Sequence, residues 1–163
     1  MPSPELSSRY FFTLGVKGRG QNVLSRHIAL LGGSLRKTAE THPFKVLAMV
    51  VLPEHLHCIM EFPEGDDDHA LRWKSIQSLF SNALAKNEFL SRSRLHRRDR
   101  GIWQRQYKSY KIHTEVELRY GMAYIHRDPV KHGLVSHEQD WPYSTYQSLG
   151  AKPRLSAVRN KKF

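Results

Sequence analysis

The sequence predicts an α+β domain in which helices cover one face of an antiparallel sheet. Its apolar residues follow the two-residue period of strands and the longer period of helices, in the order strand, helix, strand, strand, helix, strand, helix. Only Pro53 and Glu54 separate the second strand from the third, which indicates a hairpin. This order is typical of a ferredoxin-like or RRM-like sandwich.

The first half of the chain supplies three strands and one helix. Residues 10–16 are aromatic, β-branched and apolar on both faces, which predicts a central strand. A helix is expected from Ser25 onward, with the glycine pair at 32–33 marking either close packing or a local break. Further strands are expected at residues 44–52 and 55–62.

The second half supplies two helices and a further strand. The aspartates at 66–68 precede a helical stripe, so capping of that helix is favoured over a metal site on a loop. Residues 102–112 interleave aromatic and cationic side chains, which suits an amphipathic strand with Trp103 in the core or an arm that stacks on bases. A last helix is expected at residues 115–127, ended by Pro129.

The length of 163 residues suits one domain. We expect that domain to span residues 1–150, with the apolar segment 141–146 packing back on it, and residues 151–163 to form a basic tail. Residues 91–100 are the most basic segment and have no apolar period, which predicts a loop.

The charge balance indicates a polyanionic partner. The chain has 26 Lys and Arg against 15 Asp and Glu, a formal net charge of +11, which fits nucleic acid first but also a ribosomal or membrane-surface protein. The one cysteine, Cys58, excludes an intrachain disulfide and a Cys-rich zinc module, and we expect it to be buried. Since no apolar run has the length of a membrane span and signal-peptide features are absent, we expect a soluble intracellular protein.

His55 and His57 lie on the third predicted strand, separated by one residue. Because side chains alternate along a strand, the two imidazoles point to the same face and make half of a metal site. Ten histidines in 163 residues would produce roughly 0.6 His-x-His pairs by chance. The pair alone therefore leaves a non-functional alternative open, in which the two histidines are polar residues on the solvent face of the sheet.

Five motifs occur in order along the chain: residues 52–59 (LPEHLHCI), 64–68 (EGDDD), 102–105 (IWQR), 124–135 (YIHRDPVKHGLV) and 140–144 (DWPYS). Together they resemble the REP-associated tyrosine transposases of bacteria, relatives of the insertion-sequence transposases that cut and rejoin single-stranded DNA with one tyrosine and an HUH metal site. The similarity covers about residues 10–146. One departure follows Arg105, where the family typically has a run like Phe-Trp-Glu-His and this chain has YKSY at 107–110.

The resemblance implies a chemistry and its residues. His55 and His57 match the HUH metal ligands, and Tyr124 matches the nucleophile that nicks a strand to leave a 5′-phosphotyrosine and a free 3′-hydroxyl. The implied substrates are single-stranded or hairpin DNA, chiefly repetitive extragenic palindromes, and the implied setting is the nucleoid of a bacterial cytoplasm. Tyr120, one turn before Tyr124, is expected to have a core or stacking role.

A divalent cation suits this chemistry, because a phenol with a pKa of about 10 is a weak nucleophile at neutral pH. Asp128 lies four residues after Tyr124, which puts it on the same helix face as a candidate third ligand. Related transposases usually carry an amide there, and Pro129 weakens the helix-face argument. Two imidazoles and a carboxylate suit Mg²⁺ or Mn²⁺, and the ligand types alone also admit zinc.

Candidate DNA contacts come from cationic residues of a basic turn, the basic loop, the predicted fourth strand and the segment after the last helix. They are Lys17, Arg19, Arg97, Arg98, Arg100, Arg105, Lys108, Lys131 and His132. For Lys131 and His132, a solvated loop is an equal alternative. For the whole chain, the alternative to a metal-dependent endonuclease and strand transferase is a nucleic-acid-binding module that does no cutting. The sequence does not distinguish a monomer from a homodimer.

Overall fold

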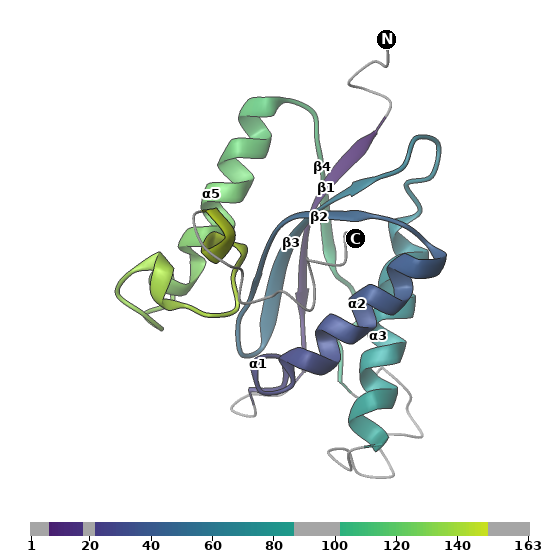
Figure 1. Ribbon diagram of the computed structural model, residues 1–163, viewed down its shortest axis with the longest axis horizontal. Helices are drawn as coiled ribbons and strands as arrows, with labels where there is room; N and C mark the ends of the chain where they lie inside the picture. The colour runs from purple at the N-terminus through teal and green to yellow at the C-terminus, as the bar shows by residue number, and fades with distance from the viewer. Residues whose placement is uncertain (1–6, 18–21, 87–101, 150–163) are drawn as a thin grey trace.

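The computed structural model describes residues 7–17, 22–86 and 102–149, and Figure 1 shows their arrangement. The strands are β1 (Ser8–Gly15), β2 (Lys45–Val51), β3 (His55–Phe62) and β4 (Lys108–Ile112). The helices are α1 (Val23–Arg26), α2 (Ile28–Thr41), α3 (His69–Lys86) and α5 (Glu115–Lys131), with short 3-10 helices η3 (Glu138–Asp140) and η4 (Thr145–Leu149). The strands form one antiparallel sheet in the order β2-β3-β1-β4, which with α2 and α3 gives the predicted ferredoxin-like arrangement.

Helices α2 and α3 cover one face of the sheet, as predicted (Figure 1). Alternate residues of the central strands point to this face, where Phe12 of β1 packs in the main core with Leu35 of α2 and Trp73 of α3. Helix α5 is an addition to this arrangement and packs on the opposite face, over β2 and β3. There Ile59 and Ile125 belong to a second, smaller core. A site on that face therefore lies between the sheet and α5.

The predicted first helix is confirmed as α2, but it begins after His27 and is not capped by Ser25, which lies in the short helix α1. The backbone of His27 has φ −120° and ψ 42°, outside the helical region, and its carbonyl accepts the N–H groups of Leu30 and Leu31 at 3.0 and 3.1 Å. Helix α2 thus starts anew after this residue. The glycine pair causes no break, because α2 continues to Thr41 with Gly32 buried.

Helix α5 extends to Lys131, so the prediction that Asp128 and Pro129 end it is wrong. Proline removes one N–H donor and disfavours a helical backbone in the residue before it. Here Asp128 and Pro129 are both buried, and this packing outweighs the local preference. The N–H of His132 still bonds to the carbonyl of Asp128 at 3.0 Å. Asp128 therefore keeps helical geometry relative to both Tyr124 and His132.

The stretch of aromatic and cationic residues divides into two parts. Only Lys108–Ile112 forms strand β4. Trp103 is buried, and its indole N–H donates to the carbonyl of Gln77 at 3.2 Å, so the core position predicted for this residue is confirmed. On β4, Lys108 and Tyr110 are exposed.

The acidic turn caps α3, as predicted. A side-chain oxygen of Asp68 accepts the N–H of Leu71 at 3.0 Å. Asp66 accepts from both terminal nitrogens of the fully buried Arg72, at 3.1 and 2.9 Å, and this contact lowers the pKa of the Asp66 carboxyl below its ordinary value. Arg72 also donates to the carbonyl of Pro43 at 2.8 Å, which ties the acidic turn to the segment before β2.

The apolar segment after α5 packs against β2, as predicted. The N–H of Val51 donates to the carbonyl of Tyr143 at 2.9 Å, and the indole of Trp141 donates to the carbonyl of Val51 at 3.0 Å. Thr145 Oγ1 contacts Nε2 of His126 at 2.9 Å, which joins the segment to α5 as well. These contacts fasten the last two turns of α5 to the sheet.

Part of the predicted organisation lies outside the described residues, namely the basic loop at 91–100 and the tail at 151–163. Within the described part of the chain, no helix combines the length and apolar character that a membrane crossing requires. Cys58 is buried in the main core, the environment predicted for it.

Candidate active site

Two histidines of β3 form one wall of the candidate site. His55 and His57 leave the same face of the strand, as predicted, and their ring centroids lie 5.1 Å apart. Ile59, the next residue to point that way, belongs to the core beneath α5. The two imidazoles therefore face the helix that carries Tyr124 and Asp128.

Thr13 orients the ring of His57. The two residues are cross-strand partners in β1 and β3, and Thr13 Oγ1 lies 2.9 Å from Nδ1 of His57. When the hydroxyl accepts a hydrogen bond from Nδ1–H, the lone pair of Nε2 is free to bind a cation. Nε2 lies 3.1 Å from Asp128 Oδ2, so the bond to Thr13 points the binding nitrogen at the carboxylate.

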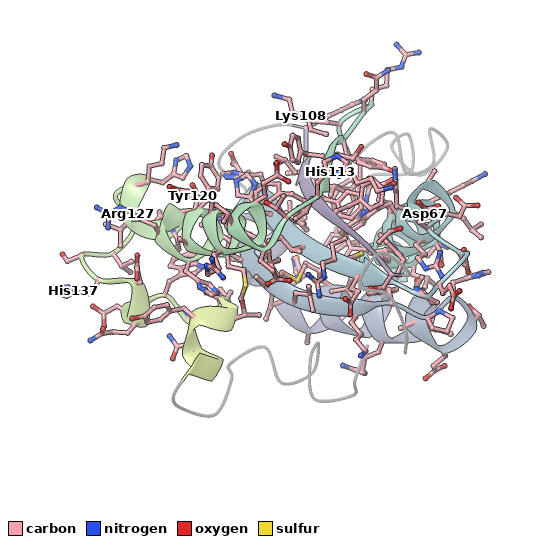
Figure 2. All side chains as sticks on the ribbon, turned by 90° about the horizontal axis from the view of Figure 1, so that it is seen from above. Asp67, Lys108, His113, Tyr120, Arg127 and His137 are labelled. Carbon is pink, nitrogen blue, oxygen red and sulfur yellow. The ribbon has the colours of Figure 1, made fainter. Side chains whose placement is uncertain are left out.

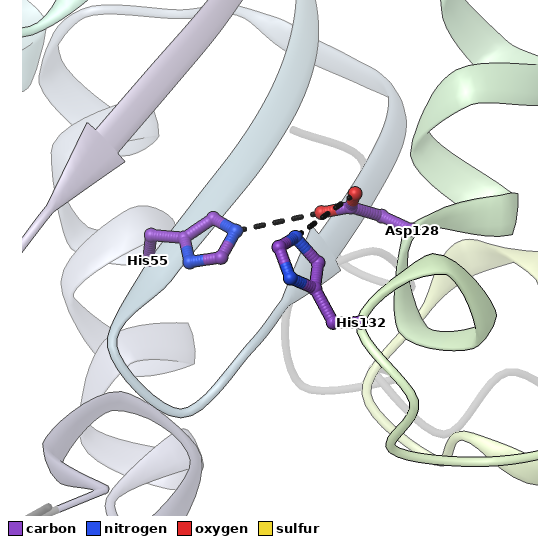
Figure 3. Close-up of side chains that lie close together, drawn as sticks. All are labelled: His55, Asp128 and His132. Atoms are coloured by element: carbon purple, nitrogen blue, oxygen red, sulfur yellow. Dashed lines mark ion pairs between the residues drawn. The ribbon is translucent and has the colours of Figure 1, made fainter.

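Asp128 lies between His55 and His132 at the centre of the site (Figure 3). Only 1% of its side chain is exposed. Its Oδ2 lies 3.1 Å from Nε2 of His57 and 3.4 Å from Nε2 of His55, and its Oδ1 lies 3.4 Å from Nε2 of His132. Neither oxygen has a well-aligned hydrogen-bond partner among the described residues. Burial alone would raise the pKa of this carboxyl, but the imidazoles of His55 and His57 outweigh it and lower the pKa.

The donor set fits a divalent cation. Ligand atoms of His55, Asp128 and His132 all lie within 4.8 Å of one another. Ligands bound to one ion at about 2.0–2.2 Å are separated by up to about 4.4 Å, so small side-chain rotations would suffice. A buried carboxylate flanked by imidazoles is also an arrangement that a bound positive charge stabilises. Imidazole and carboxylate donors of this kind bind Mn²⁺, Zn²⁺ and related ions, and the carboxylate also suits Mg²⁺.

Tyr124 lies at the rim of this centre, one turn before Asp128 on α5. Its ring centroid is 5.4 Å from that of His57 and 5.8 Å from that of Phe11, both in edge-on geometry. The ammonium of Lys131 lies 4.9 Å from the ring centroid. Because 45% of Tyr124 is exposed, a large substrate can reach the phenol.

Tyr120 lies one turn further from the histidines and is 75% exposed, so the core role considered for it is wrong and the stacking role stays a prediction. In Figure 2, Tyr120 of α5 and Lys108 of β4 both project toward the top of the view. Of the two neighbouring tyrosines, the described contacts join only Tyr124 to a histidine of the site.

The predicted DNA contacts fall into three groups. Lys17, Arg105 and Lys108 are exposed, Lys131 lies beside Tyr124, and Arg19, Arg97, Arg98 and Arg100 lie outside the described residues. Lys108 pairs with Thr13, which pairs with His57, so these three side chains form one row on the same face of the sheet. The row links an exposed cation on β4 to the candidate site.

His132 belongs to the site geometry, although the sequence assigned it to DNA contacts. Its ring centroid lies 5.2 Å from that of His55, and its Nε2 faces Asp128. The available signal was the four-residue spacing from Asp128, which has structural meaning only if the helix continues past Pro129. The role of Thr13 had no such signal, because it depends on the register between β1 and β3.

Comparisons with known proteins agree on one family. No protein-family model matches the chain. A relative from Haemophilus influenzae is 35% identical over 138 residues, covering 84% of this chain and 78% of the relative. A relative from Escherichia coli is 35% identical over 137 residues, covering 84% of this chain and 75% of the relative. Both are described as REP-associated tyrosine transposases, the first provisionally.

A solved structure supports the same assignment. It is a REP-associated tyrosine transposase bound to a REP hairpin, and it matches this chain with a TM-score of 0.77 at 34% identity. The match covers 90% of this chain and 83% of that one. Identity above 30% across most of each relative, together with the shared fold, shows that this chain belongs to the REP-associated tyrosine transposases.

Proposed function

We propose that this chain nicks and rejoins single-stranded DNA at REP-type hairpins through a 5′-phosphotyrosine intermediate on Tyr124, with a bound divalent cation. One observation carries the proposal: the phenol of Tyr124 lies beside His57 at the rim of a buried carboxylate flanked by imidazoles. Family membership supports it, and the relative of known structure was solved with a REP hairpin.

His55, His57 and Asp128 would hold the cation, which the donor types allow to be Mg²⁺ or Mn²⁺. A bound cation supplies positive charge that polarises the scissile phosphate and stabilises the charge that develops on it. Thr13 positions His57 for this purpose through the contact at 2.9 Å.

The nicking step forms one bond and breaks one. The phenolic oxygen of Tyr124 attacks phosphorus and releases its proton to water. The bond from phosphorus to the 3′-oxygen breaks, and the 3′-oxygen takes up a proton from water and leaves as a hydroxyl. The ammonium of Lys131, 4.9 Å from the ring centroid, favours the negative charge that develops on the phenol. Rejoining is the reverse, in which a 3′-hydroxyl attacks the phosphotyrosine and releases Tyr124.

The DNA strand would approach along the exposed part of the sheet. Lys108 shares a cross-strand row with Thr13 and His57, and the exposed ring of Tyr110 follows two residues later on β4. Cations that follow a phosphate backbone and aromatic rings that stack on bases are the usual components of a single-strand track.

The test is an adduct assay with labelled REP hairpins that carry single-stranded flanks. With Mn²⁺ or Mg²⁺, the wild type should form a protein–DNA adduct that resists denaturation. Tyr124→Phe should abolish this adduct and still bind the hairpin, whereas the matched control Tyr120→Phe should keep both. A wild type that binds hairpins and forms no adduct with either cation would be a binding module that does no cutting.

A further inference from the structure

We infer that His132 is a ligand of the same cation, which makes the centre rich in nitrogen donors and selects Mn²⁺ and other imidazole-binding transition metals over Mg²⁺. The inference rests on the proposed function for the cation's presence. It extends that function by adding a ligand and choosing between the two cations.

The carboxylate of Asp128 faces imidazoles from two places in the fold. His55 and His57 of β3 approach Oδ2 of Asp128, at 3.4 and 3.1 Å. His132 approaches the other oxygen, Oδ1, at 3.4 Å from the end of α5 (Figure 3). Ligand atoms of His55, Asp128 and His132 lie within 4.8 Å of one another, and His57 adjoins this set with its Nε2 at 3.1 Å from Asp128 Oδ2.

The end of α5 fixes His132 in place. Asp128 lies in the last turn of α5 and His132, four residues later, caps its end, where the N–H of His132 bonds to the carbonyl of Asp128 at 3.0 Å. Residues at this spacing share one helix face, which is how a pair of helical histidines holds zinc in many metalloenzymes. Gly133, with a φ of +73°, turns the chain away directly afterwards.

The ring of His132 is partly exposed to solvent. The side chain of His132 is 46% exposed, whereas that of Asp128 is 1% exposed. The outer side of the ring faces solvent, so it can rotate by the small amount needed to bring Nε2 to an ion at the carboxylate. His132 would thus close the open side of a centre whose other donors are fixed by β3 and α5.

The donor chemistry decides the cation. Mg²⁺ prefers oxygen ligands and keeps several waters, whereas imidazole suits first-row transition metals, whose affinity rises from Mn²⁺ to Co²⁺ and beyond. Three imidazoles and one carboxylate therefore favour Mn²⁺ over Mg²⁺ and bind Co²⁺ more tightly still. Co²⁺ is also a useful probe, because its visible absorption reports the number and type of ligands.

The test measures cation binding by the full chain, independently of cleavage. Titration of the wild type with Co²⁺ should give a saturable absorption band, and Mn²⁺ should raise the Tm more than Mg²⁺ at equal concentration. His132→Ala should weaken Co²⁺ binding by at least about tenfold and change the band, because even loss of an outer-shell partner costs about 10–100-fold. His132→Gln, which replaces a nitrogen donor by an oxygen donor, should reduce the preference for Mn²⁺ over Mg²⁺.

The matched control is His137→Ala, which removes an exposed histidine from the segment after α5, labelled in Figure 2, and should bind Co²⁺ like the wild type. Circular dichroism verifies that each variant is folded. The inference is overturned if His132→Ala and His132→Gln both bind Co²⁺ with the affinity and spectrum of the wild type, or if the wild type binds none. If both His132 variants bind the cation like the wild type and the wild type forms the adduct, only the role of His132 is refuted. If the His132 variants lose cation affinity as expected and the wild type forms no adduct, only the proposed cleavage is refuted.

Discussion

Replacing Thr13 with valine removes one hydroxyl from the candidate site and keeps the shape of the side chain. Thr13 Oγ1 lies 2.9 Å from Nδ1 of His57, whose side chain is 7% exposed. In Thr13→Val the buried Nδ1 loses its partner, and an unsatisfied buried polar group costs about 1–3 kcal/mol. Because Thr13 is itself only half-buried, we expect the lower part of that range, about 1–2 kcal/mol.

This cost falls on the cation-bound state, because only there must Nε2 face Asp128 while Nδ1 faces the missing hydroxyl, so it becomes a measurable loss of cation affinity. Without the hydroxyl, the imidazole of His57 no longer has a preferred orientation with Nε2 toward Asp128. A cost of about 1–2 kcal/mol corresponds to about 5–30-fold weaker binding. Thr13→Ser keeps the hydroxyl and is the matched control, with affinity close to that of the wild type.

The assay combines Co²⁺ titration with adduct formation at low and at saturating Mn²⁺. If Thr13 acts by orienting His57, adduct formation by Thr13→Val should be slow at low Mn²⁺ and should recover at saturation. Wild-type Co²⁺ affinity in Thr13→Val would refute the orienting role. A defect that persists at saturating Mn²⁺ would show that Thr13 acts on the chemical step instead.

Three further perturbations test other parts of the structure. A Cβ added at Gly121 would lie 3.0 Å from Ile59 Cδ1, so Gly121→Leu should push α5 away from the sheet. The variant should have a lower Tm in calorimetry and a lower yield of adduct on a denaturing gel. An unchanged adduct yield would contradict the placement of Tyr124 by this packing. Arg72→Met should lower the free energy of unfolding by about 2–3 kcal/mol in urea titrations, because it removes the hydrogen bonds that the buried guanidinium donates to Asp66 and to the carbonyls of Pro43 and Asp68. Arg72 also lowers the pKa of the Asp66 carboxyl below its ordinary value of 3.8, so their pairing stabilises the fold above that pH and is lost as the pH falls through the lowered pKa. On acidification below about pH 4, the wild type should therefore lose more stability than Arg72→Met. Equal losses in the two proteins would refute the coupling. Chelation of a protein loaded at a hundredfold excess over Kd should remove about 2.7 kcal/mol of stability, seen as a fall in Tm, and a constant Tm would argue against a bound cation.

Local rules predicted much of the site from the sequence. The shared face of His55 and His57 follows from strand alternation alone, and capping by Asp68 follows from an acid at a helix start. The burial of Trp103 was one of two compatible interpretations of its segment, and the contacts of its indole confirm it, whereas stacking of this segment on bases stays a prediction. Each of these depends on neighbours a few residues away, which a sequence displays directly.

Non-local packing explains what the sequence did not predict. The preference of the residue before proline ended the last helix too early, because burial of Asp128 and Pro129 is a property of the folded domain. That error also concealed the place of His132, which faces Asp128 only if the turn is helical. Thr13 and His57 are 44 residues apart in the sequence, and their contact depends on the register between β1 and β3. A local sequence pattern does not specify that register.

The most direct test of the account is to identify the residue that carries the DNA in the covalent adduct. Trypsin releases residues 120–127 (YGMAYIHR) as one peptide containing both candidate tyrosines, so fragmentation mass spectrometry of the nuclease-trimmed adduct can assign the phosphonucleotide to one of them. The account predicts that the 5′-phosphate is on Tyr124, beside His57. A modification on Tyr120, or on a residue outside this peptide, would contradict it.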